Sequence, residues 1–254
     1  MLIIISAAKK LDLESPPKTD KYSIPSLLPG SILLVDKLKK CEISELTKLM
    51  NISYGLSELN LRRYETWNTP FTPENARQAC FTYFGDVYQG LDIKNFSQKD
   101  IDYAQKTLRI ISGLYGTLRP LDLIQPYRLP MGTKLITNKG KNLYDFWGEK
   151  ITEQINKSLA EKNTKILINL ASNEYFKALN PKKINATIYK PVFMQFKNGN
   201  YRVVSFYAKK ARGLMSQYII KNKITNIEDL KNFNMEDYSF NKELSVGEKL
   251  VFVR

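Results

Sequence analysis

Two short, continuous apolar runs constrain the fold of this chain most. They are Leu2–Ile5 and the segment 165–170, with sequence KILINL. Each is too short for a typical helix and is followed at once by polar residues, which is the pattern of a strand buried on both faces of a sheet. Amphipathic helical patterns lie between and around these runs. The sequence therefore predicts a mixed α/β fold with a central, mostly buried sheet.

Polar side chains follow both predicted strands. The first strand leads into SAAKKLD (residues 6–12) and the second into ASNE (residues 171–174). Because α/β sheets bind ligands beyond the carboxyl ends of their strands, Ser6, Lys9, Asp12, Ser172 and Glu174 are candidates to line one pocket. The alternative is that these side chains only cap strand ends in solvent, and residue type alone favours that alternative.

A helical subregion is predicted at roughly 26–112. Its helices are marked by Leu28, Ile32, Val35 and Leu38, then by 44–50, then by 58–67 after a tight link around Gly55. This pattern is similar to a helix-hairpin-helix element, with Arg62 and Arg63 exposed on its last helix. DNA-binding hairpins usually carry two glycines and this one has a single glycine, so a plain helical hairpin is the alternative. Helices are also predicted to start at Thr72-Pro73 and to span 97–111.

A long loop is predicted at 112–132, where three glycines and three prolines interrupt any regular element. Long ordered loops are commonly functional. The main polar residues of this loop are Arg119, Asp122, Tyr127 and Arg128, which either contact a ligand or clamp the loop internally through Arg–Asp pairs.

The remaining pattern completes a single predicted domain, residues 1–254. A helix is expected at 142–159, a hairpin at 187–196 and 201–207 around Asn198-Gly199, and a final strand at 249–253. No repeat, linker or low-complexity segment divides the chain.

Positive charge is concentrated in one part of the sequence. The net charge is +14, and residues 175–227 contain no acid and eleven basic residues. The last strand of the predicted hairpin runs into a helix, and Lys209, Lys210 and Arg212 stand at this junction, where helix-terminal N–H groups also favour anions. An acid-free stretch of this length is typical of a protein that binds a polyanion. The alternative is a solvated charged face.

Composition excludes several kinds of chemistry. The chain has no histidine, which excludes Ser–His–Asp and Cys–His catalysis and histidine-based zinc sites. Cys41 and Cys80 are isolated, which is typical of a cytoplasmic protein without disulfides. No apolar run approaches the ~18 residues of a membrane span, and the N-terminus does not resemble a signal peptide. We expect no cofactor, no metal and no membrane association.

Four segments resemble the YaaA family of bacterial peroxide-stress proteins. They are SGLYGTLRPLDLIQPYRLPMG (112–132), NLYDFW (142–147), NLASNEYFK (169–177) and FYAKKARGLM (206–215). The resemblance spans nearly the whole chain. At the N-terminus the family pattern is Ser-Pro-Ala-Lys-Thr-Leu-Asp, and here Ser6, Lys9, Leu11 and Asp12 match it while the proline and threonine are replaced.

The resemblance implies a cytoplasmic, compact α/β protein of unusual fold that protects DNA during peroxide stress. It also implies binding of double-stranded DNA through a positive cleft with a helix-hairpin-helix-like element. The family motifs resemble an active site, but they do not define a reaction or a small-molecule ligand.

Three functions are compatible with these patterns. The first is DNA binding, in which a set of basic side chains neutralises phosphates: Lys182, Lys183, Lys190, Lys209, Lys210 and Arg212, assisted by Arg62 and Arg63. The second is a DNA-repair enzyme that uses Lys9 or Lys209 as a Schiff-base nucleophile on a damaged or flipped nucleotide, with Glu174 or Asp12 as general acid or base. The third is a stress protein that acts on iron or on a small phosphorylated ligand, although the sequence shows no carboxylate cluster for iron.

Overall fold

The computed structural model describes all residues, 1–254, and is built on one large sheet. The sheet has eight strands in the order β11-β12-β9-β8-β1-β5-β6, with β10 paired to β9. Their bounds are β1 Leu2–Ser6, β5 Leu108–Ser112, β6 Gly116–Leu118, β8 Ile166–Asn169, β9 Thr187–Lys197, β10 Asn200–Arg202, β11 Ser239–Val246 and β12 Lys249–Val253. The five central strands, β12 to β5, are parallel, and the strands at the margins are antiparallel.

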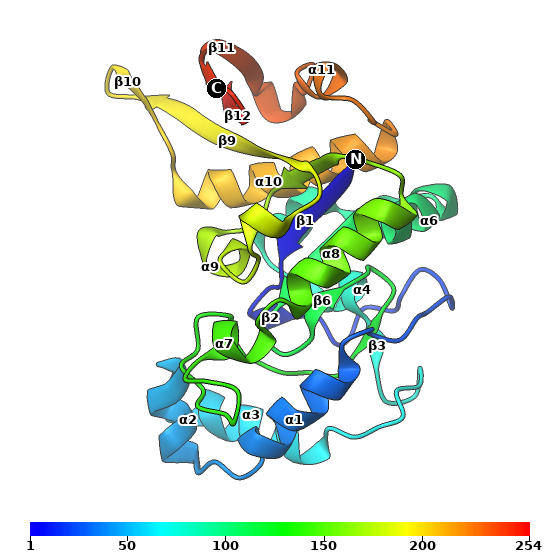
Figure 1. Ribbon diagram of the computed structural model, residues 1–254, viewed down its shortest axis with the longest axis vertical. Coiled ribbons are helices and arrows are strands. Elements are labelled where there is room, and N and C mark those ends of the chain that lie inside the picture. The colour runs from blue at the N-terminus through cyan, green and yellow to red at the C-terminus, as the bar shows by residue number, and fades with distance from the viewer.

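Both apolar runs are confirmed as buried strands, and they are neighbours. Ile4 of β1 is in register with Asn169 of β8 on one side and with Arg109 of β5 on the other. Residues 2–5 are completely buried because helices cover both faces of the sheet. Helix α8 (Lys150–Glu161) lies over one face, and α10 (Ser205–Lys221) crosses the opposite face (Figure 1).

Helix α10 shares its face with α5 (Asp86–Leu91) and α6 (Gln98–Thr107). The prediction of one helix over 97–111 was wrong for its last four residues, 108–111. The chain leaves α6 at Thr107 and forms β5, whose apolar residues pair with β1 in the centre of the sheet. A short apolar run fits a helix and a strand equally well by periodicity, and this run becomes a strand because β1 offers it a partner.

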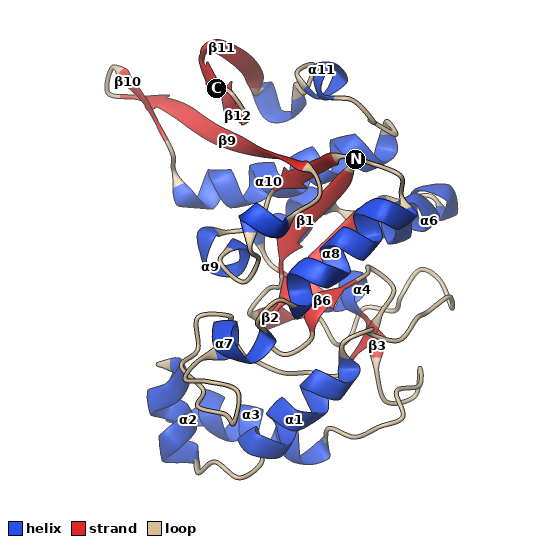
Figure 2. Ribbon diagram, in the orientation of Figure 1, coloured by secondary structure: helices blue, strands red, loops and turns tan.

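The helical subregion exists, but it is built differently from the prediction. It contains α1 (Leu28–Leu38), α2 (Ile43–Met50), α3 (Tyr54–Thr66) and the later α7 (Leu143–Trp147), grouped at the lower end in Figures 1 and 2. Residues 86–112 instead belong to the layer that covers the sheet and to the sheet itself. Helix α3 starts at Tyr54 with Ser53 as its N-cap, so Gly55 lies in its first turn rather than in the link. A helix-hairpin-helix element is therefore not confirmed.

Several other predicted element boundaries differ from those in the structure. Residues 72–75 form a turn, and the first helix after them is α4 (Ala79–Thr82). The helix expected at 142–159 is divided into α7 and α8 by Gly148, which has φ +50°. The hairpin turn at Asn198-Gly199 is confirmed, with φ of 53° and 77°, but β10 ends at Arg202 and α10 begins at Ser205. Phe206 and Tyr207 are therefore helical, and Lys209 lies inside the helix rather than at a junction.

Short elements complete the chain. They are β2 Lys10–Leu11, β3 Arg77–Gln78, β4 Tyr83–Phe84, β7 Leu123–Ile124, η1 Ile93–Asn95, α9 Asn173–Phe176, η2 Pro181–Lys183, α11 Ile227–Leu230 and η3 Met235–Asp237. None of the helices combines the length and the apolar composition that crossing a bilayer requires.

Candidate functional site

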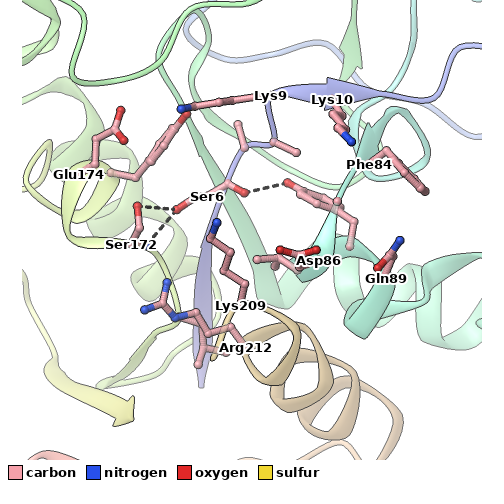
Figure 3. Close-up of a pocket in the computed structure, with 17 residues that line it drawn as sticks. Ser6, Lys9, Lys10, Phe84, Asp86, Gln89, Ser172, Glu174, Lys209 and Arg212 are labelled. Carbon is pink, nitrogen blue, oxygen red and sulfur yellow. Dashed lines mark hydrogen bonds between the residues drawn. The ribbon is translucent and has the colours of Figure 1, made fainter. Parts of the chain in front are cut away.

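A cavity of about 490 Å³ lies at the carboxyl ends of β1 and β8. Four segments line it: residues 6–10 after β1, residues 84–89 at the start of α5, residues 170–175 after β8, and one side of α10 (Figure 3). The parallel register of β1 and β8 brings the first and third segments together. The sequence-predicted convergence of the two polar strand ends is confirmed.

Ser6 and Ser172 form the link between the two strand ends. The Ser6 hydroxyl oxygen accepts a hydrogen bond from the backbone N–H of Ser172 at 3.0 Å and donates one to the Ser172 hydroxyl at 3.4 Å. The Ser6 carbonyl accepts from the Tyr88 hydroxyl at 3.1 Å. Burial raises the pKa of Tyr88 well above its ordinary value, which keeps this phenol protonated as a donor. Ser6 is thus held by both neighbouring segments, through its hydroxyl by Ser172 and through its carbonyl by Tyr88.

Two cations from α10 reach the cavity on the same side as these serines. Lys209 and Arg212 are three residues apart and therefore share one face of the helix (Figure 3). Neither side chain makes an ion pair or a hydrogen bond within the protein. Burial lowers the pKa of the Arg212 guanidinium. Lys210 belongs to another face of the helix and forms an ion pair with Glu236 at 2.5 Å.

The close crossing of α5 and α10 positions these cations. The two helices meet at Gly90 and Gly213 with direct backbone contact. A Cβ atom at Gly213 would overlap the carbonyl oxygen of Val87, and one at Gly90 would overlap that of Lys210. Only glycine permits this approach, which sets Lys209 and Arg212 opposite the first turn of α5.

Lys9 and Glu174 occupy another side of the cavity. Lys9 extends its amine toward the side of the cavity where Glu174 stands (Figure 3). The Glu174 carboxylate accepts a hydrogen bond from the backbone N–H of Gly132 at 2.9 Å, which ties the end of the long loop to the site. Tyr127 and Arg128 line a small recess beside Lys9. Tyr127 itself is buried and makes 2.6 Å hydrogen bonds with Tyr83 and Ser112.

Three residues predicted for the pocket lie elsewhere. Asp12 pairs with Lys94 at 2.8 Å and caps the turn that follows β2. Arg119 and Asp122 pair with each other at 3.0 Å, and Ser23 donates to Asp122 at 2.6 Å. These residues clamp the long loop, as the alternative reading of that loop allowed. Lys94 and Ser23 are distant in sequence from Asp12 and Asp122, so the sequence alone did not place these two carboxylates outside the pocket.

The predicted DNA-binding residues are distributed over several elements. Lys182 is exposed at η2, Lys183 pairs with Glu149 at 3.2 Å, and Lys190 donates to Asn173 at 3.4 Å. Arg62 pairs with Glu58 on α3 at 2.8 Å. Arg63 is half-buried, and burial together with the nearby Arg128 lowers its pKa. Lys209 and Arg212 are the members that line the cavity.

Several cavity residues were not singled out from the sequence. They are Lys10, Phe84, Asp86, Tyr88, Gln89 and Tyr175. Most of them belong to residues 83–93, an aromatic segment punctuated by glycines. Gly85 followed by Asp86 is the signal that could have found them, since a glycine followed by an acid often starts a helix.

Fold and site together define an α/β protein with a polar, partly cationic pocket at the carboxyl edge of a parallel sheet. The sequence model of the family described as peroxide stress protein YaaA matches residues 1–244, and the chain belongs to this family. It is also similar to a UPF0246 protein of Colwellia psychrerythraea (strain 34H / ATCC BAA-681). The two are 53% identical over 254 residues, which cover 100% of this chain and 99% of the relative. Family membership supports a role in peroxide stress.

Proposed function

We propose that this protein acts in the peroxide stress response by binding DNA through its phosphate backbone. The observation that carries the proposal is the acid-free stretch 175–227, which supplies η2, β9, β10 and α10. Lys182, Lys197 and Arg202 on these elements are exposed and form no ion pair. Exposed, unpaired cations on neighbouring elements are the ordinary means of holding a polyanion.

Contacts to phosphates predict a strong dependence of affinity on salt. The logarithm of the binding constant should fall by about 0.9 per logarithm of salt concentration for each phosphate contact. The test is fluorescence anisotropy with a duplex that has 5′-hydroxyl ends, measured across a salt series. The variant Lys197→Ala/Arg202→Ala should bind more weakly and with a shallower slope.

A matched control comes from Lys183, which is basic and exposed but already paired with Glu149. Lys183→Ala should change the affinity and the slope less than the double variant does. Affinity that does not depend on salt would contradict the proposal, and so would equal effects of the control and the double variant.

A second candidate function is a lysine-dependent reaction on damaged DNA, favoured by the placement of Lys9 in the cavity with Glu174 and Asp86. The neutral amine of Lys9 would attack the aldehyde carbon of an abasic sugar, and the resulting carbinolamine would lose water to give an iminium ion. Borohydride would reduce that ion to a stable secondary amine. Wild type and Lys10→Arg should then form a covalent adduct with abasic DNA, whereas Lys9→Arg should not. Absence of an adduct with wild type removes this candidate.

A further inference from the structure

Lys209 and Arg212 bring two positive charges to one end of the cavity, and neither forms an ion pair with Asp86 or Glu174, the two acids of its lining. Lys209 and Arg212 have no carboxylate partner, and the nearby Glu236 is occupied by Lys210 and Arg254. A half-buried guanidinium without a partner is unfavourable unless an anion pairs with it. This end of the cavity therefore has the electrostatics of an anion site.

Two hydroxyl groups stand at the same end. Ser6 donates to Ser172, and the Ser172 hydroxyl has no acceptor of its own within the protein. Its hydrogen is free to be donated to a ligand oxygen. Two cations and a free hydroxyl donor match a group with charge near −2 and several oxygens, which describes a phosphomonoester better than a phosphodiester or a carboxylate.

The other end of the cavity differs in chemistry. It is bordered by Phe84, Asp86 and Gln89, which Figure 3 shows on the side away from Ser172 and Arg212. The Phe84 ring is 43% exposed at the rim. The carboxylate of Asp86 and the amide of Gln89 make no hydrogen bond within the protein. An open aromatic face beside free donors and acceptors is suited to stacking on a planar base and to hydrogen bonding with its edge.

We propose that this cavity binds a nucleotide through a terminal phosphomonoester, with the phosphate at Ser172, Lys209 and Arg212 and the base at Phe84. The volume of about 490 Å³ lies within the ~300–1,000 Å³ typical of small-molecule sites. The phosphomonoester comes from a free nucleoside monophosphate or from the phosphorylated end of a DNA strand. The second source rests on the proposed function, and the first does not.

Isothermal titration calorimetry with deoxyadenosine monophosphate, deoxyadenosine and inorganic phosphate tests this site. Wild type should bind the monophosphate at least ~10-fold more tightly than the nucleoside, because the phosphate adds charge-assisted hydrogen bonds, which are stronger than neutral ones. Arg212→Ala should weaken the binding of both the monophosphate and inorganic phosphate. Phe84→Ala should weaken the binding of the monophosphate and leave the binding of inorganic phosphate unchanged. Lys210 is paired with Glu236, so Lys210→Ala should leave the affinities for the monophosphate and for inorganic phosphate unchanged.

Three outcomes would contradict the proposed nucleotide site. They are no measurable binding of the monophosphate, equal binding of monophosphate and nucleoside, and equal effects of Arg212→Ala and Lys210→Ala. Circular dichroism of each variant establishes that it is folded before it is titrated.

Duplexes with 5′-phosphate, 3′-phosphate or hydroxyl ends distinguish the two sources. Tighter binding of a phosphorylated end, lost in Arg212→Ala, assigns the site to DNA ends. Tight binding of the free monophosphate without any preference among the duplexes assigns it to free nucleotides. The hydroxyl-ended duplex tests the proposed function alone, so failure of DNA binding and failure of this site are distinguishable.

Discussion

Asp12 illustrates how a single residue can resemble a site residue and serve as a structural anchor. It follows the first strand by six residues, yet its carboxylate holds Lys94 of η1 and accepts from the backbone N–H groups of Glu14 and Ser15. The hydrogen bond from Lys94, followed by that from Ser15, holds the pKa of Asp12 well below its usual range. The folded state therefore stabilises the charged form.

Asp12→Asn should lower the free energy of unfolding by about 1 kcal/mol at pH 7, because the charged contacts are lost. A carboxyl group whose pKa is depressed by folding contributes its stability above its unfolded pKa, ~3.9. This contribution is lost as pH falls below that value. The difference between wild type and variant should therefore shrink below about pH 4. Urea denaturation at several pH values measures it.

Asp20→Asn is the matched control, because Asp20 is exposed and forms no ion pair. It should leave the stability unchanged at each pH. A difference for Asp12→Asn that is as large at low pH as at pH 7 would show that the ion pair is not its cause. Binding of DNA and of nucleotides should be unaffected by either substitution.

The cavity residues that the sequence predicted are of two kinds. Some follow a buried strand, and the others lie on the face of α10 that lines the cavity. Ser6, Lys9, Ser172 and Glu174 are of the first kind, and Lys209 and Arg212 are of the second. Asp12, Arg119 and Asp122 lie outside the cavity. Asp12 pairs with Lys94 and Asp122 accepts a hydrogen bond from Ser23, partners that only the folded chain brings near, whereas Arg119 pairs with Asp122 three residues away. Residue type alone carries no information on such distant partners.

The crossing of α5 and α10 is the element-scale feature on which the site depends. Gly90 and Gly213 remove the side chains between the helices, so that backbone atoms of one meet those of the other. A larger residue at either position would push α10, and with it Lys209 and Arg212, away from the cavity.

Gly213→Ala should therefore destabilise the protein by about 3 kcal/mol, as overpacking that forces a backbone shift does. Chemical denaturation measures the loss. The control is Gly55→Ala in the first turn of α3, where a Cβ meets no atom within 4 Å. Because alanine favours a helix over glycine by ~0.5–1 kcal/mol, this control should be neutral or stabilising. Equal losses in the two variants would contradict the account of the crossing.

At the scale of elements, the sequence predicted what its local pattern determines. The strands β1, β8 and β12 and the turn at Asn198-Gly199 have unambiguous apolar runs or turn residues. The strand β5 was missed because Leu108, Ile110 and Ile111 continue the apolar pattern of α6, and only pairing of Ile5 with Ile110 makes them a strand. Residues 72–75 carry helix-start residues but continue into a turn, since β3 and β7 pair directly after them.

The whole molecule has a sheet part and a helical part, joined by residues 112–132. The sequence predicted this segment as a loop without regular elements, but it contains the short strands β6 and β7. Trp147 of α7 donates to the Gly113 carbonyl at 2.9 Å, and Trp67, just after α3, donates to the Tyr115 hydroxyl at 3.1 Å. Tyr64 of α3 donates to the Arg128 carbonyl. The buried residues of both parts form one continuous hydrophobic cluster. This segment with many glycines and prolines thus serves as the shared packing surface of the two parts.

This shared core predicts that the two parts unfold together. Both tryptophans, Trp67 and Trp147, contact the connecting loop from the helical side, so their fluorescence reports that side, whereas far-UV circular dichroism reports the whole chain. The two guanidinium transitions should coincide. Leu34→Ala in α1 empties a completely buried position and should cost about 2–5 kcal/mol. Because the core is continuous, this variant should shift both transitions equally. A shift of the fluorescence transition alone would mean that the helical part is a separate domain.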